Sequence, residues 1–187
     1  MRSVFVDIQS ENITSAYLEG ISHYKIRAQL ESEEYKIISF KENARLRIGK
    51  GIESFISENG NLVGERILYI PGKGKYLTKI PFSTQEAIDA TNASKGGNDF
   101  YLNHEQIEKA LNYSIQLPDE NFEIPLKEFW KNTRYGKITK FIFEEEAKDY
   151  GKFFWGYLRK FRTKEIPVRT AKMKDKPFTR QLWFNCL

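Results

Sequence analysis

Cysteine and histidine are nearly absent from this chain. Cysteine occurs once, at Cys186, and histidine twice, at His23 and His104, among 187 residues. A single thiol cannot form an internal disulfide or a cysteine-based zinc site, and two histidines leave little for other metal chemistry. We therefore expect a cytoplasmic protein that holds no metal and no other cofactor.

Long apolar runs are also absent. No stretch approaches the roughly 18 consecutive apolar residues that a membrane helix needs. The first residues, MRSVFVDIQSEN, lack the apolar stretch of a signal peptide. Hydrophobic residues still make up 40% of the chain and aromatic ones 14%, which suffices for a packed core. The sequence predicts a single folded domain over residues 1–187, with no membrane partner.

The net charge of +5 is unevenly distributed. Residues 151–187 contain ten Lys and Arg against two acidic residues, whereas the preceding residues carry a slight excess of acid. A basic segment on a nearly neutral body favours a polyanionic partner, although a solvated lysine-rich tail has the same composition. The final stretch, TRQLWFNCL, has an apolar strand pattern without a polar tail, and we expect it to continue into a longer protein.

Most of the chain shows the two-residue alternation of β-strands. Helical spacing appears after Lys50, over 103–113, and over 145–161, where Gly151 and Gly156 weaken the pattern. Asn103 and Gln106 have the spacing of a capping box. Strands are expected over 3–8, 23–30, 34–40, 44–48, 68–71, 75–82, 99–102, 121–130, 136–146, 165–170 and 180–184. A turn is expected over 71–75 and a loop over 91–99.

Residues 46–70, LRIGKGIESFISENGNLVGERILYI, resemble the second half of a B3 domain. This is the DNA-binding pseudobarrel of plant transcription factors and of some bacterial restriction enzymes. The shared pattern is a strand, Lys50-Gly51, an apolar helix face, then Gly64, expected in a turn with positive φ, Glu65 and a second apolar strand. The resemblance implies a mixed α/β, mainly antiparallel fold, in which a B3-like pseudobarrel carries two short helices and an extra C-terminal helix.

The same resemblance implies recognition of double-stranded DNA through the major groove. The chain would be the targeting module of a bacterial restriction or defence protein, with a nuclease or motor on another domain or subunit. Arginine and asparagine can read bases in that groove, and lysine can hold phosphates. The first of two arms would be a strand with Arg45 and Arg47 on one face, unless this strand is only a solvated edge. The candidate DNA-binding residues are Lys41, Asn43, Arg45, Arg47, Lys50, Lys95, Asn98, Tyr101 and Asn103.

A nuclease is the alternative. Pro118-Asp119 precedes Glu146-Ala147-Lys148 by a spacing typical of PD-(D/E)xK enzymes, whose carboxylates hold Mg²⁺ while the lysine orients the attacking water. The composition around Asp119 is that of a turn, however, and Glu146 can equally belong to a helix start. We therefore expect a binding domain, with Asp119, Glu146 and Lys148 as the alternative catalytic set.

Overall fold

The computed structural model describes residues 8–10, 13–15, 38–58, 61–80, 100–159 and 163–184. The helices are α2 (Phe40–Lys50), α3 (Phe55–Glu58), α5 (His104–Leu111), α6 (Arg134–Phe143) and α7 (Ala147–Leu158), with the 3-10 turns η1 (Leu126–Glu128) and η2 (Glu144–Glu146). The strands are β1 (Ile8–Ser10), β2 (Ile13–Ser15), β3 (Asn61–Ile70), β4 (Gly74–Thr78), β5 (Phe100–Tyr101), β6 (Ser114–Gln116), β7 (Phe122–Pro125), β8 (Glu165–Val168) and β9 (Phe178–Phe184).

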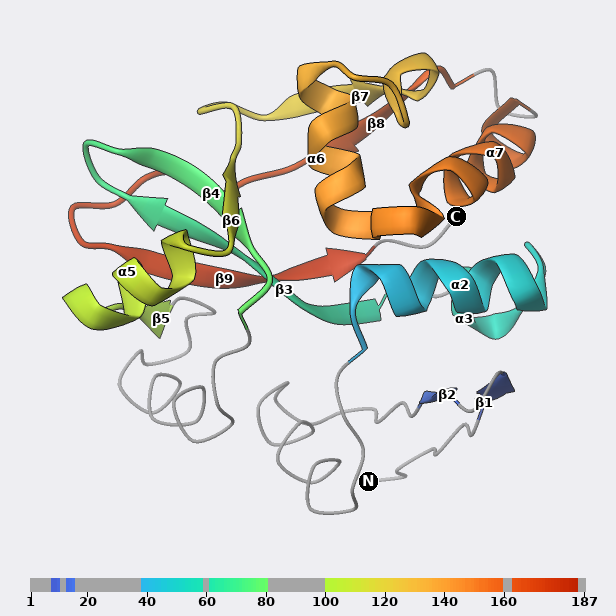
Figure 1. Cartoon of the computed structure of the whole chain (residues 1–187), viewed down its shortest axis with the longest axis horizontal. Coiled ribbons are helices and arrows are strands. Elements are labelled where there is room, and N and C mark those ends of the chain that lie inside the picture. The colour runs from blue at the N-terminus through green and yellow to red at the C-terminus, as the bar shows by residue number, and fades with distance from the viewer. Residues whose placement is uncertain are drawn as a thin grey trace.

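Five strands form an antiparallel sheet in the order β5-β9-β3-β4-β6 (Figure 1). β7 pairs with β8 in a separate two-stranded sheet, and β1 pairs with β2. The prediction of a mixed α/β, mainly antiparallel fold is confirmed. The pseudobarrel is not, because the described strands form no closed barrel: β5 and β6 end the sheet instead of pairing with each other. No helix in the described segments is long and apolar enough to cross a membrane.

The central strand β3 divides the hydrophobic core into two layers, because successive side chains of a strand point to opposite faces. Ile67 and Tyr69 pack on one face with residues of α2, α6 and α7. Leu68 and Ile70 pack on the other face with Ala110 of α5. The sheet is thus covered on both faces.

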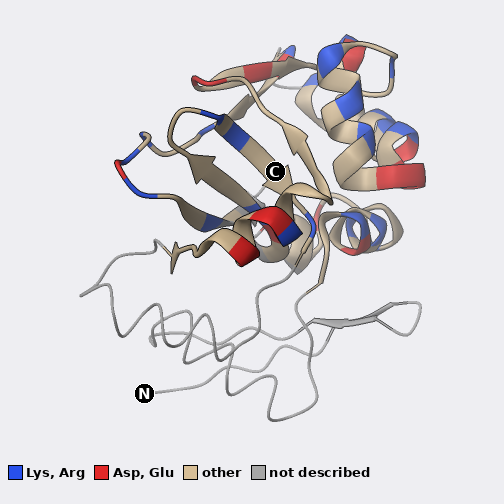
Figure 2. Ribbon diagram, turned by 60° about the vertical axis from the view of Figure 1, so that its left-hand side comes forward, with Lys and Arg blue, Asp and Glu red and all other residues tan. Residues whose placement is uncertain are grey.

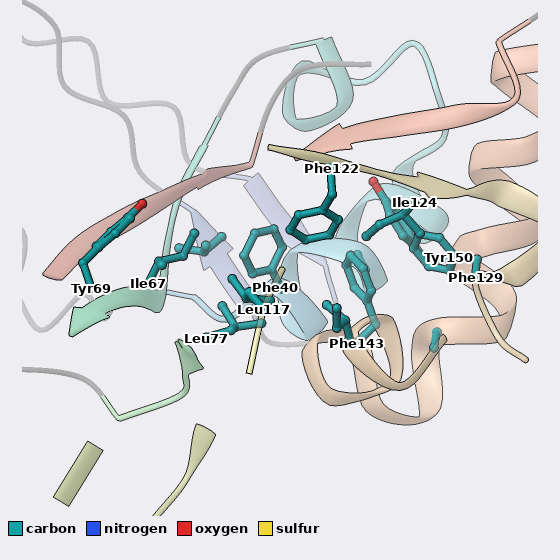
Figure 3. Close-up of a cluster of buried hydrophobic side chains, with 14 of the residues drawn as sticks. Phe40, Ile67, Tyr69, Leu77, Leu117, Phe122, Ile124, Phe129, Phe143 and Tyr150 are labelled. Atoms are coloured by element: carbon teal, nitrogen blue, oxygen red, sulfur yellow. The ribbon is translucent and has the colours of Figure 1, made fainter. Parts of the chain in front are cut away.

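Phe143 at the end of α6 is the centre of an aromatic cluster that holds three helices together (Figure 3). Its ring centroid lies 5.7 Å from that of Phe40 on α2, 5.4 Å from Phe129 and 4.9 Å from Tyr150 on α7. Such ring pairs add roughly 0.5–1.5 kcal/mol each beyond the area they bury. The cluster therefore fixes α2, α6 and α7 on the same face of the sheet.

The strand predicted over 44–48 is wrong, because this segment lies inside α2. Ser39 and Glu42 form a reciprocal capping box at its start, and the Gly51 N–H, from a residue with φ of 87°, bonds to the Arg47 carbonyl at its end. The side chains of Ala44 and Arg47 are fully buried at helical spacing. Arg45 and Arg47 consequently do not share a face, and the predicted DNA-reading strand does not exist.

The strand predicted over 136–146 is also wrong. This segment forms α6 and η2, and the Thr133 side chain caps α6 by accepting a hydrogen bond from the Gly136 N–H. Gly64 lies inside β3 and is not among the described glycines with positive φ, so its predicted turn is wrong too. The apolar pattern of 136–146 and of the segment around Gly64 is compatible with more than one local structure. Tertiary packing determines which of these structures forms.

Several other predictions are confirmed. The capping box of Asn103 and Gln106 opens α5, and α7 forms within 145–161. The turn expected over 71–75 forms at 71–73, between β3 and β4. β5, β7 and β8 lie within their expected segments, and β9 begins two residues before the strand expected over 180–184. The loop expected over 91–99 and the strand expected over 23–30 lie outside the described residues. Of the strand expected over 3–8, only Ile8 is described, and it begins β1.

Glu65 joins β3 to the start of α2. Its two carboxylate oxygens accept hydrogen bonds from the Phe40 backbone N–H, at 3.1 and 3.0 Å, and its side chain is almost completely buried. Burial raises the pKa of Glu65 to about 7; the Phe40 hydrogen bonds and the charge of Lys79 oppose this rise, and Glu42 adds to it. The buried carboxyl group therefore titrates near neutral pH.

This raised pKa predicts that stability falls as pH rises. Between the unfolded pKa and about 7 the folded protein retains a proton on Glu65 that the unfolded chain loses, so folding weakens through this interval. At about 1.4 kcal/mol per pKa unit, the loss reaches up to about 3 kcal/mol by pH 8. Urea unfolding from pH 5 to pH 8 measures it. Glu65→Gln should flatten the profile, whereas Glu105→Gln on exposed α5 should leave it unchanged; equal profiles for both variants would contradict the assignment.

Two glycines of α7 provide a matched test of its packing. A Cβ on Gly151 would lie 2.7 Å from the Trp130 ring and 3.0 Å from that of Phe129, whereas one on Gly156 would meet nothing within 4 Å. Gly151→Ala should lower the free energy of unfolding by about 1–3 kcal/mol through overpacking. Gly156→Ala should raise it by up to about 1 kcal/mol, because alanine favours helix. Chemical denaturation measures both, and a stabilising Gly151→Ala would contradict the packing of α7 on Trp130.

Candidate functional site

A polar groove of about 750 Å³ opens where the β3–β4 turn, the segment 116–121 and the segment 170–173 meet. Three lysines line it, Lys73, Lys75 and Lys172, together with the acidic residues Asp119 and Glu120. Gly74 shapes its wall: φ is 106°, and a Cβ there would lie 3.1 Å from Asp119 Oδ1. Glycine thus allows the turn to approach the acidic segment closely.

Lys75 is the most unusual residue of the groove, because only 5% of it is exposed. Its Nζ donates a hydrogen bond to Thr170 Oγ1 at 2.8 Å and lies 5.9 Å from the centre of the Tyr69 ring. Within the described segments no carboxylate forms an ion pair with it. An ammonium group has three N–H donors, and one of them is used by Thr170.

Residues 169–173, here called the strap, are fastened across the groove by further hydrogen bonds. The Thr170 N–H and hydroxyl donate to Asn121 Oδ1 at 2.8 and 3.3 Å. The Ala171 N–H donates to the Tyr69 hydroxyl at 2.8 Å. The strap therefore connects the groove to the sheet through side chains on both sides of it.

Beneath the strap lies an apolar cavity of about 500 Å³, between the sheet, α6 and the β7–β8 pair. Phe122, Ile124, Tyr69 and Phe143 are among its lining residues. Figure 3 shows these side chains within the cluster of buried hydrophobic residues. Thr170 and Ala171 line the cavity as well as the groove. The two spaces therefore meet at the strap.

The first predicted DNA-binding arm is occupied by ion pairs. Lys41 Nζ lies 2.9 Å from Glu144 and 2.6 Å from Glu145, and Arg45 lies 3.0 Å from Glu146. Figure 2 shows this acidic η2 segment close to the basic residues of α2. Hydrogen bonds from Lys79 and Lys41 lower the pKa of Glu144 to about 2. The ion pairs of Lys41 and Arg45 therefore hold α2 to η2.

The remaining residues of the two arms do not form one surface. Asn43 and Arg47 are fully buried, and Arg47 Nη1 lies 3.4 Å from the Tyr150 hydroxyl. Lys50 is exposed at the end of α2, whereas Tyr101 and Asn103 lie on β5 and at the start of α5. Lys95 and Asn98 lie outside the described residues.

The alternative nuclease residues are not brought together either. Asp119 lines the polar groove, Glu146 pairs with Arg45, and Lys148 is exposed on α7. No group of three or more metal-ligating side chains occurs in the part of the chain that the structure describes. The arrangement gives no support to a PD-(D/E)xK centre.

Except for Asp119, which was considered only as a nuclease residue, the residues that line the groove were missed by sequence reasoning. Lys75 and Thr170 are separated by 95 positions, and Asn121 and Thr170 by 49. One local signal exists: Lys75 shares a strand face with the buried Leu77, so a lysine stands where the alternation requires an inward side chain.

Comparisons with known proteins bear on the fold. No protein-family model and no curated protein matches the sequence. A solved structure described as accommodation of massive sequence variation in Nanoarchaeota by the C-type lectin fold is similar, with a TM-score of 0.61 and 14% identity. The match covers 86% of this chain and 82% of that one. At this identity the similarity concerns the fold alone.

The resemblance to a B3 domain is therefore wrong. The similar structure has a C-type lectin fold, and the segment expected to be a B3 strand is helix α2. Assignment to a restriction system and to B3-type DNA binding rested on that resemblance and falls with it. The resemblance rested on a 25-residue pattern of apolar residues, glycines and the acidic residue Glu65. A different fold satisfies this pattern equally well.

The hydrogen bond between Ala171 and Tyr69 predicts how firmly the strap is held. Tyr69→Phe removes the acceptor but keeps the ring, which stacks on Phe178 at 4.4 Å with 2° between the planes. Loss of this hydrogen bond should lower the free energy of opening the strap by about 1 kcal/mol. Hydrogen exchange at the Ala171 N–H should accelerate by roughly fivefold, while exchange in α5 should stay unchanged. Unaltered exchange at Ala171 would show that this bond does not hold the strap.

Proposed function

We propose that this chain is a ligand-recognition domain, not an enzyme, and that its polar groove binds a small molecule carrying one anionic group, a carboxylate or a phosphate. The single observation that carries the proposal is Lys75, a nearly buried cation with which no described carboxylate forms an ion pair. Lys75 and the Thr170 that its ammonium group contacts both line a groove large enough for such a ligand.

The energetics of burial favour this ligand class. Removing an ammonium group from water costs several kcal/mol unless an opposite charge and hydrogen bonds compensate. Thr170 and the Tyr69 ring provide part of this compensation. An anion held by the remaining N–H donors would supply the rest, and charge-assisted hydrogen bonds of this kind are about twice as strong as neutral ones.

The acidic residues of the groove limit how much negative charge the ligand carries. Asp119 and Glu120 line the same space as Lys75 and repel a second or third anionic group. Their oxygens instead accept hydrogen bonds from hydroxyl or amino groups. A small, singly anionic ligand with donor groups fits this charge pattern better than a polyanion.

The fold is compatible with a recognition role. The similar structure is described as a fold that accommodates massive sequence variation. In this chain the groove is built from turns and connecting segments at the end of the sheet, and such segments tolerate substitution more readily than strands do. Duplex DNA as a partner stays a prediction of the sequence, and none of the residues expected to read it lines the groove.

The test is a titration with acetate and with methyl phosphate. Binding is measured through the changes in the backbone ¹⁵N and ¹H chemical shifts of Gly74, Lys75 and Thr170. The wild type should show saturable shifts at these residues. Lys75→Met should weaken binding at least tenfold, because it removes the buried positive charge.

Lys73→Met is the matched control, since Lys73 is exposed at the rim of the same groove and should change affinity by less than about threefold. Thermal melting verifies that both variants fold. Equal affinities for the wild type and Lys75→Met would rule out the proposed site.

A further inference from the structure

We infer that the ligand of the groove is amphipathic, with an apolar body that occupies the cavity beneath the strap. This inference rests on the proposed function, because it places the anionic group of the same molecule at Lys75. The observation behind it is the shared wall: Thr170 and Ala171 line both spaces, and Lys75 bonds to Thr170.

The size and lining of the cavity support an apolar occupant. Its volume of about 500 Å³ lies within the range of roughly 300–1,000 Å³ that small-molecule sites occupy. Protein interiors are otherwise close-packed, with few voids larger than a water molecule. The lining consists mainly of aliphatic and aromatic side chains, which do not favour ordered water; Arg169 and Arg180 are its charged members.

The strap gives this ligand a way in. The strap is hydrogen-bonded to the sheet through the Ala171 N–H and the Tyr69 hydroxyl. It is hydrogen-bonded to the segment after β6 through Thr170 and Asn121. If the bond between Ala171 and Tyr69 opened while the bonds between Thr170 and Asn121 stayed, the cavity and the groove would join. The contact between Lys75 and Thr170 would be kept. An anion at Lys75 and an alkyl or aryl body at Tyr69 would then be adjacent parts of one molecule.

A chain-length series tests the inference. Straight-chain carboxylates from acetate to decanoate, and the corresponding alkyl phosphates, are titrated below their micellar concentrations, and Kd is plotted against the number of carbons. Each methylene buried in the cavity should tighten binding about fourfold until the cavity is full. The two series differ only in the head group and show which anion Lys75 prefers.

Variants that fill the cavity provide the structural control. Val168→Phe on β8 should abolish the chain-length dependence while acetate still binds as in the wild type, since Val168 lines the cavity but not the groove. Ile142→Phe on α6 is the second filling variant, should Val168→Phe not fold. Ile107→Phe, in the separate cluster around α5, should leave the series unchanged.

The outcomes separate the two proposals. If acetate binds through Lys75 but affinity does not change with chain length, the amphipathic ligand is excluded and the groove remains an anion site. A chain-length dependence that persists in Lys75→Met, or in both filling variants, overturns the inference that one molecule spans the two spaces. No binding of any member of either series overturns both proposals.

Discussion

The position of the Tyr69 side chain is the constraint on which the sheet, the strap and both spaces depend. Tyr69 lies opposite Phe178 in the β3–β9 ladder, and the two rings stack with centroids 4.4 Å apart. The stacked pair belongs to the core cluster. From this fixed position the ring lines the apolar cavity, faces the Lys75 ammonium and accepts the strap through its hydroxyl. One side chain thereby connects the sheet, the apolar cavity, Lys75 and the strap.

The sequence predicted those elements whose signals are local. The capping box at Asn103 and the glycine-containing turn within 71–75 depend on signals only a few residues long, and both occur in the structure. Helix α2 was misread because its inner face contains Asn43 and Arg47, so an amphipathic stripe was not visible. Its start signal, Ser39 with Glu42, was present but lay within a segment that also alternates like a strand.

The site was beyond prediction for a different reason. Its contacts join β4 to the strap and the strap to Asn121 over long separations in sequence, and no periodicity encodes such pairs. Charge composition pointed elsewhere: Lys41 and Arg45 were expected to face DNA, but both are held by the acidic residues of η2. A count of basic residues therefore overstates the positive surface that a partner can reach.

The departures from ordinary folding rules are informative because of where they occur. Around the groove and cavity the chain has a nearly buried lysine without a described acidic partner, a positive-φ glycine against a carboxylate, and an unfilled apolar space. Two other cations, Arg47 and Arg66, are also buried, and Arg47 lies away from this region with its Nη1 3.4 Å from the Tyr150 hydroxyl. Chains generally violate local rules at functional sites and offset the cost elsewhere. In this chain the aromatic cluster and the doubly covered sheet are the parts whose packing can offset the cost of the groove and cavity.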